Sequence, residues 1–77
     1  MKVELNLFAS LRKYRPPGND KEIIDISQNI NIAQLLKDKE IPLEEAIVLL
    51  VNGVRVDYNH VLQEGDKISA FPLIMGG

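Results

Sequence analysis

Two glycines, Gly76 and Gly77, end the chain, so its terminal carboxylate sits on a residue without a side chain. That carboxylate is ionised at neutral pH, since an α-carboxyl group titrates at about 3.3 to 3.7, and it is then a poor electrophile. If a partner enzyme joins it to AMP, the leaving group becomes a stabilised phosphate, which sulfide or an amine can displace. Glycine accepts extended and positive-φ backbone alike, so both residues can thread a narrow channel. This pattern indicates a reactive carboxylate on Gly77; the alternative is that two terminal glycines form only a disordered end.

No other residue type in the sequence forms a catalytic constellation. The absence of cysteine excludes disulfides, thiolate metal sites and a cysteine persulfide. The single histidine, His60, has no partners at metal-ligand or triad spacing and is interpreted as loop surface. The adjacent carboxylates Glu44-Glu45 are interpreted as a solvated turn, and the basic run over 12–15 as solvated surface rather than a site for an acidic partner. We therefore expect no bound cofactor and no metal.

Length and charge indicate a small single-domain protein that binds neither nucleic acid nor a membrane. Its 77 residues predict one domain, 1–77, which buries only about 60% of the surface of its unfolded form. A net charge of -2 argues against nucleic acid as a main partner. No apolar run is long enough to span a bilayer and the start is not a secretory signal, so we expect a soluble, cytoplasmic protein without a membrane partner.

The first part of the chain predicts a hairpin. Apolar residues alternate with polar ones at Val3, Leu5 and Leu7, which is the period of a strand with one buried face. The isoleucine-rich segment 22–27 predicts a second strand that pairs back on the first. Between them, 9–14 is expected to form a helical turn, and the proline- and glycine-containing segment 15–20 a loop.

A short helix is expected next. Asn31 and Gln34 have the spacing of a capping box, in which each residue satisfies a backbone N–H group of the other. Three apolar residues share one face at helical spacing, so the helix should lie on a sheet: Ile32, Leu35 and Leu36. Pro42 is expected to end this helix.

The second part predicts three further strands. The continuous apolar run 47–51 is typical of a strand covered on both faces, and Asn52-Gly53 predicts a type I′ turn into a strand over 54–57. In the last strand Ile68 and Ala70 share the face that the helix should cover. Phe71 and Leu73 then lie on the opposite, open face, together with alternate residues of 47–51, and we expect a docking surface for partners there. The alternatives are a loop folded over this face, or a dimer.

Together these elements predict an α+β fold with a mixed five-stranded sheet, one main helix on one face and the terminal strands in the middle. This order of elements resembles the β-grasp, ubiquitin-like fold.

Several motifs make the resemblance more specific. They are Phe8-Ala9-Ser10-Leu11-Arg12, the capped helix start at 31–36, Val51-Asn52-Gly53, Glu64-Gly65-Asp66, and Phe71-Pro72 before Gly76-Gly77. Over its whole length the chain resembles the family of the molybdopterin-synthase small subunit and the thiamine-pathway sulfur carrier. In that family a ubiquitin-activating-like adenylyltransferase uses ATP to adenylate the terminal glycine, which then carries sulfur as a thiocarboxylate.

The resemblance implies roles for the tail. Gly77 would carry the AMP and then the sulfur, and Gly76 would give the terminus passage into the partner. Phe71, Leu73, Ile74 and Met75 would dock partners, which include a molybdopterin-synthase large subunit or another sulfur-accepting enzyme. The chain itself would bind no cofactor and would act in catalysis only as a sulfur donor.

Two motifs favour one of the two biosynthetic branches of this family. Phe8-Ala9 followed by Leu11-Arg12, and Phe71-Pro72 before the tail, resemble the molybdopterin branch more than the thiamine branch, whereas Lys13 and the Pro16-Pro17 loop depart from it. Three alternatives stay open: a carrier for thiamine or another sulfur-containing metabolite, a ubiquitin-like protein modifier, and an interaction module without terminal chemistry.

Overall fold

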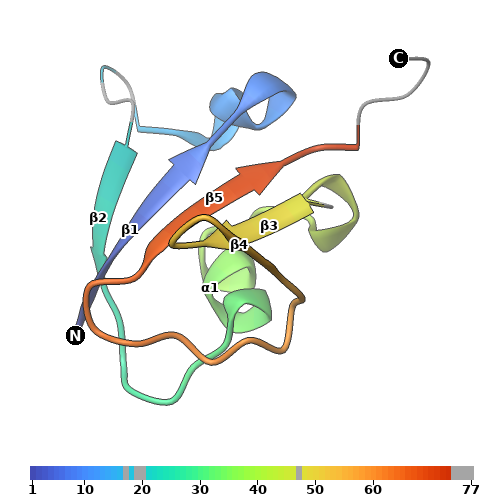
Figure 1. Ribbon diagram of the computed structural model, residues 1–77. Coiled ribbons are helices and arrows are strands. Elements are labelled where there is room, and N and C mark those ends of the chain that lie inside the picture. The colour runs from blue at the N-terminus through green and yellow to red at the C-terminus, as the bar shows by residue number, and fades with distance from the viewer. Residues whose placement is uncertain (17, 19–20, 47, 74–77) are drawn as a thin grey trace.

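The computed structural model describes residues 1–16, 18, 21–46 and 48–73 of the chain. Along the described chain, two strands precede the α-helix and three follow it, and two short 3₁₀ helices lie in the connections (Figure 1). The elements are β1 (Lys2–Leu7), η1 (Ala9–Tyr14), β2 (Lys21–Asp25), α1 (Ile32–Asp38), η2 (Leu43–Glu45), β3 (Val48–Val51), β4 (Val54–Val56) and β5 (Lys67–Phe71).

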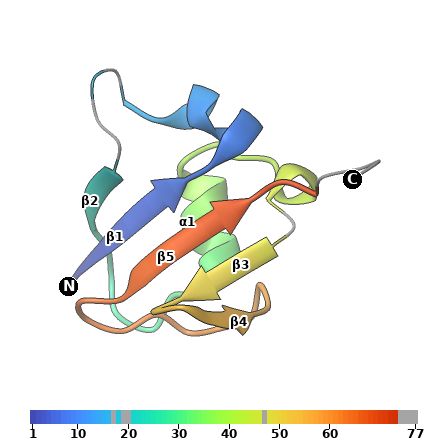
Figure 2. The same cartoon turned by 45° about the horizontal axis from the view of Figure 1, so that its top comes forward.

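The described strands form one five-stranded sheet in the order β2-β1-β5-β3-β4. The pair β1 and β5 is parallel, and the other neighbouring pairs are antiparallel. The first and last strands therefore lie side by side in the middle of the sheet, with α1 against one face (Figure 2). This arrangement confirms the predicted α+β architecture with a mixed sheet and one main helix. No helix in the described part of the chain is long and apolar enough to cross a membrane.

The core lies between the sheet and α1. The apolar side chains that β1, α1, β3 and β5 bury there are Val3, Leu5, Leu7, Ile32, Leu35, Leu36, Leu49, Val51, Ile68 and Ala70. The expectation that β3 is covered on both faces is wrong, because Val48 and Leu50 are only half-buried. Since α1 covers one face of the sheet, β3 alternates like its neighbours; Ile47, the first residue of the predicted strand, lies outside the described residues.

The start of α1 is the predicted capping box. The N–H of Gln34 donates to Oδ1 of Asn31 over 2.9 Å, and the N–H of Asn31 donates to Oε1 of Gln34 over 3.0 Å. Two backbone donors at the start of the helix are thereby satisfied, so the sequence alone fixes where α1 begins.

The end of α1 differs from the prediction, because the helix stops before it reaches Pro42. The N–H of Ile41 donates to the carbonyl of Leu36 over 2.9 Å, and the N–H of Glu40 to that of Lys37 over 3.0 Å. Glu40 has a φ of 59°. This is a Schellman motif, in which burial of the flanking apolar pair Leu36 and Ile41 accompanies a left-handed residue that is usually glycine. Because this left-handed position holds Glu40 rather than glycine, the sequence carries no glycine signal for the end of α1.

The hairpin between β3 and β4 has the predicted turn. Asn52 and Gly53 have φ values of 53° and 84°, as a type I′ turn requires. The Asn52 side chain also ties this turn to the start of β5: its Nδ2 donates to Oδ1 of Asp66 over 3.0 Å, and its Oδ1 accepts the N–H of Lys67 over 3.0 Å. Oδ2 of Asp66 accepts the N–H of Gln63 over 2.9 Å. The buried Asp66 carboxylate thus holds the turn that feeds β5.

Replacing this carboxylate should destabilise the fold. We expect Asp66→Ala to lower the free energy of unfolding by about 1–3 kcal/mol, because the Asn52 amide and the Gln63 N–H lose their acceptor. Urea denaturation followed by circular dichroism measures the change. Asp38→Ala is the control, since Asp38 is exposed and the described residues offer it no side-chain hydrogen bond; it should shift stability by no more than about 0.5 kcal/mol. Equal losses in the two variants would contradict this role of Asp66.

Candidate functional site

The described part of the tail is Phe71, Pro72 and Leu73. The remaining tail residues to which a role was assigned, Ile74, Met75, Gly76 and Gly77, lie outside the described residues. Their roles in docking, passage and adenylation therefore stay predictions. The structure instead defines the surface beside which the chain leaves the sheet.

Two stacked phenylalanines form the centre of that surface. Phe71 ends β5 on the open face, and its ring lies 4.5 Å from that of Phe8, centroid to centroid, with 8° between the ring planes. The N–H of Phe8 donates to the carbonyl of Ala70 over 3.1 Å, so the β1–β5 pairing continues beyond β1 and holds the two rings side by side. The side chain of Phe8 is 40% exposed and Phe71 is half-buried. The stacked pair therefore leaves apolar aromatic surface open to solvent.

The neighbouring strand β3 extends this surface. Val48 is paired with Phe71 and Leu50 with Ser69, and directly paired residues project from the same face of a sheet. We call Phe8, Val48, Leu50 and Phe71 the apolar patch. Its presence confirms the predicted place of Phe71 on the open face, together with alternate residues of β3. Leu73, which follows in sequence, is 58% exposed.

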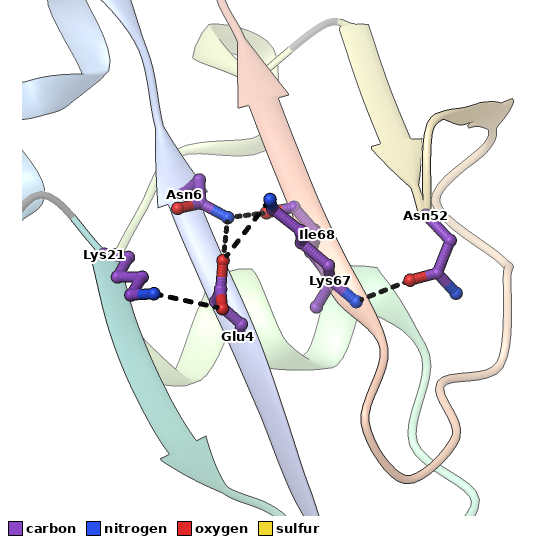
Figure 3. Close-up of polar contacts among 6 residues, drawn as sticks. All are labelled: Glu4, Asn6, Lys21, Asn52, Lys67 and Ile68. Carbon is purple, nitrogen blue, oxygen red and sulfur yellow. Dashed lines mark hydrogen bonds and ion pairs between the residues drawn. The ribbon is translucent and has the colours of Figure 1, made fainter.

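A polar cluster occupies the same face at the other end of β1 and β5 (Figure 3). The amide Nδ2 of Asn6 donates to Oε2 of Glu4 over 2.9 Å and also reaches the carbonyl of Ile68 at 3.4 Å. Nζ of Lys21 lies 3.8 Å from Oε1 of Glu4, and Nζ of Lys67 lies 3.9 Å from Oε2. Glu4 is thus held between two lysines from the neighbouring strands.

These contacts lower the pKa of the Glu4 carboxyl group. The hydrogen bond from Asn6 is the main cause that lowers the pKa of Glu4, and the charges of Lys21 and Lys67 lower it further, while partial burial opposes them. Glu4 therefore stays ionised somewhat below the usual range, and the ammonium groups beside it are more exposed than the carboxylate. The open face thus has an apolar half next to the tail and a charged half farther from it.

Sequence reasoning did not find the polar cluster or the stacking of Phe8 on Phe71. The alternation in β1 was available as a signal, since it places Glu4, Asn6 and Phe8 together on the face opposite the core. Their partners could not be read locally, because Lys67 and Phe71 reach them only through the parallel register of β1 and β5.

Three of the other residues considered from sequence make structural contacts: Lys13, Glu45 and His60. Oε2 of Glu45 accepts the hydroxyl of Tyr14 over 3.1 Å, and its Oε1 lies 3.3 Å from Nζ of Lys13. Burial, followed by the contact with Glu45, raises the pKa of Tyr14. His60 is half-buried, and its backbone carbonyl accepts the N–H of Ile32 over 3.1 Å. Residues 1–16, 18, 21–46 and 48–73 contain no cluster of three or more His, Cys, Asp or Glu that could hold a metal ion.

Known structures match this fold along its length. A protein proposed to be subunit 1 of molybdopterin converting factor from Pyrococcus furiosus superimposes with a TM-score of 0.71 at 24% identity, over 95% of this chain and 98% of the other. Small archaeal modifier protein 1 from Haloferax volcanii gives 0.75 at 20% identity, over 95% and 98%. A chain from the complex of subunits 1 and 2 of molybdopterin-converting factor from Helicobacter pylori gives 0.60 at 27% identity, over 100% of each. A search of curated proteins found no match.

These likenesses establish the class first: the chain has the β-grasp fold of ubiquitin-like proteins, as predicted. The family follows from sequence. The model of the ThiS family matches residues 5–77, and the chain belongs to this family of ubiquitin-like sulfur carriers. The resemblance noted from the sequence motifs is thereby confirmed, while the pathway is a separate question.

The polar cluster predicts how stability depends on pH. Because the pKa of Glu4 is lowered by folding, its contribution is fully present above the unfolded value of about 4.3 and is lost as the pH falls through the folded value. The difference in unfolding free energy between the parent and Glu4→Gln should therefore shrink as the pH drops below about 4. Urea denaturation at several pH values measures it.

Glu44→Gln is the matched control for this prediction, because Glu44 is exposed and its side chain forms no hydrogen bond or ion pair within the described residues. Its stability difference from the parent is the reference with which the Glu4→Gln difference is compared at each pH. A Glu4→Gln difference that grows toward low pH would contradict the lowered pKa.

Proposed function

We propose that this chain is a sulfur carrier whose C-terminal glycine, Gly77, is adenylated and then converted to a thiocarboxylate, and that it donates sulfur in molybdopterin biosynthesis as a molybdopterin-synthase small subunit. The observation that carries the proposal is the partly exposed apolar patch at the end of β5, from which the sequence continues within a few residues to Gly76-Gly77. A partner that covers the patch has the tail within reach. The proposal requires Gly77 to carry the free carboxylate.

The chemistry needs only the carboxylate from this chain. In the active site of the adenylyltransferase, a carboxylate oxygen of Gly77 attacks the α-phosphorus of ATP, and pyrophosphate leaves. Hydrosulfide then attacks the carbonyl of the resulting acyl adenylate, AMP departs with the bonding electrons, and a thiocarboxylate remains. Loss of AMP rather than oxide makes the second step feasible. ATP belongs to the activating partner, and Gly76 lets the terminus enter that partner's channel.

The open face suits the binding of such partners. The stacked Phe8 and Phe71 supply aromatic area that is already ordered, so little conformational entropy is lost on docking. The cluster around Glu4 lies at the other end of the same face and can fix orientation through charge. Likeness to the chain from the Helicobacter pylori complex of subunits 1 and 2 supports a large subunit as one of these partners. Ile74 and Met75 would extend the contact along the tail.

The choice of the molybdopterin pathway rests on finer features. Phe8-Ala9 before Leu11-Arg12, and Phe71-Pro72 before the tail, resemble the molybdopterin branch of the family. Delivery of sulfur to thiamine or another sulfur-containing metabolite is the alternative within the same chemistry. An assay with each accepting enzyme separates the two, because only the cognate acceptor should consume the thiocarboxylate.

A second candidate function is protein modification through an amide bond between Gly77 and target lysines. It is supported by the fold likeness to small archaeal modifier protein 1, and it uses the same activated terminus. Adducts of higher mass in cell extracts that vanish when Gly77 is removed would favour it. A third candidate, an interaction module without terminal chemistry, requires that binding and function survive removal of Gly77.

The terminal chemistry can be tested directly. After incubation with ATP, a cognate adenylyltransferase and hydrosulfide, we expect intact-protein mass spectrometry to show one oxygen replaced by sulfur at Gly77. Deletion of Gly77 should abolish this product and leave the thermal unfolding midpoint nearly unchanged, because a terminal glycine buries little surface. No mass change with a competent enzyme would overturn the proposal.

The role of the apolar patch has its own test. Phe71→Ala should weaken binding of the adenylyltransferase or large subunit by about 30-fold, which corresponds to about 2 kcal/mol for an aromatic anchor. Isothermal titration calorimetry measures the affinity. Val54→Ala is the control: Val54 is 64% exposed but is paired with the buried Val51, on the opposite face of the sheet. Equal affinities for the two variants would mean that partners dock elsewhere.

A further inference from the structure

The outer side of β2 is an open sheet edge. Met1 and Ile26 exchange two hydrogen bonds, of 2.8 Å from the Ile26 N–H and 2.9 Å from the Met1 amino group. Because antiparallel pairs alternate between bonded and non-bonded, Ile24 bonds to β1 while the backbone groups of Ile23 and Asp25 point outward. No strand of the described chain pairs with that side, and an unpaired edge is a template for an added strand.

A groove lies beside this edge, between β2 and the helix. Its volume is about 220 Å³. Leu35 of α1 is the buried residue in its lining, and three half-buried isoleucines form its apolar walls: Ile24, Ile26 and Ile30. Polar residues complete the lining: Asp25, Ser27, Asp38 and Lys39. An edge with free backbone groups and an adjoining apolar groove are the two parts that strand addition uses.

The size of the groove and the charges around it indicate what kind of molecule it can bind. It is smaller than the roughly 300–1,000 Å³ of typical small-molecule sites, and it suits the side chains of a peptide better than a metabolite. Among the lining charges, the Asp25 carboxylate is paired with the Met1 amino group at 3.4 Å, and the ammonium group of Lys39 is paired with Glu22. The exposed carboxylate of Asp38 has no ion-pair partner within the described residues. One buried oxygen of Glu22, Oε1, has no hydrogen-bond partner in the described part of the protein. This side is therefore complementary to a cationic segment.

We propose that the β2 edge binds an extended peptide segment of a partner protein, in which aliphatic residues alternate with polar ones and lysine or arginine flanks them. The segment adds as a further strand that bonds to the outward groups of Ile23 and Asp25. Its aliphatic side chains enter the groove, and one of its basic ends lies near Asp38. Side chains on its other face pack beside Ile23, which is 58% exposed.

This inference goes beyond the proposed function and does not depend on the terminal chemistry. The strand β1 separates β2 from β5, so the peptide and a partner on the apolar patch occupy different parts of the sheet (Figure 1). A carrier or modifier engaged through Phe71 can therefore still be held by its β2 edge.

The test is an NMR titration of the full ¹⁵N-labelled chain with the blocked peptide Lys-Ile-Thr-Ile-Thr-Ile-Lys. We expect amide shifts concentrated at Ile23, Asp25 and the groove, and slowed hydrogen exchange at the outward amides. The peptide with proline at both threonine positions should not bind, because it cannot form the ladder. The peptide with glutamate at both ends should bind less tightly than the lysine form. Shifts confined to the apolar patch, or none, would overturn the proposal.

Variants of the protein sharpen this test. Asp38→Lys should weaken the lysine-flanked peptide by about threefold or more, and Glu44→Lys, an equal charge change at an exposed site outside the groove, should not. Ile23→Pro removes an outward N–H and should abolish binding; if it unfolds the chain, the Asp38 and Glu44 pair still decides.

Two further measurements can each reject the proposal. Deletion of Gly77 should leave peptide affinity unchanged, and loss of affinity there would mean that the two surfaces are not independent. Sedimentation of the unliganded chain should show a monomer, since a dimer closed through β2 would make a second copy the occupant.

Discussion

The parallel pairing of β1 with β5 is the constraint on which the rest of the structure depends. It joins the first and last strands in the middle of the sheet, with Leu5 opposite Ile68 and Leu7 opposite Ala70. Parallel neighbours end on the same side, so the chain leaves β5 beside the point where it leaves β1. Phe8 and Phe71 meet for that reason, and the tail departs next to the only aromatic stack among the described residues.

A sheet covered on one face by a single helix explains why an apolar surface is left open. The period of two sends half of the side chains of β1, β3 and β5 toward α1 and half away from it. The described residues form no second α-helix that could cover the other half. Phe8 is 40% exposed, so its burial contributes less hydrophobic stabilisation than a fully buried phenylalanine would. A small domain has a marginal core, so this loss matters for its stability. A partner that covers Phe8 in a complex would recover this stabilisation.

The features that could be predicted from the sequence are those that depend on residues close together in the chain. The capping box at Asn31, the turn at Asn52-Gly53 and the alternation in β1 and β5 each depend on neighbours in the chain, and all three are confirmed. The end of α1 was missed because the left-handed residue is Glu40 rather than glycine. The Glu4 cluster was missed because it draws side chains from β1, β2 and β5, and only the sheet register brings them together.

The two candidate binding surfaces differ in the kind of recognition they can provide. The open face offers side chains, namely a ring stack and a charged cluster, so its fit depends on the shape and charge of a particular protein surface. The β2 edge offers mostly backbone groups, which accept many sequences and discriminate only through the small groove and its carboxylates. If the proposed function holds, selection between partners uses the open face, where a wrong partner would leave Glu4 and the lysines buried without matching charges. The β2 edge is separated by β1 from Phe71 on β5, so a peptide on the edge leaves the ring stack accessible.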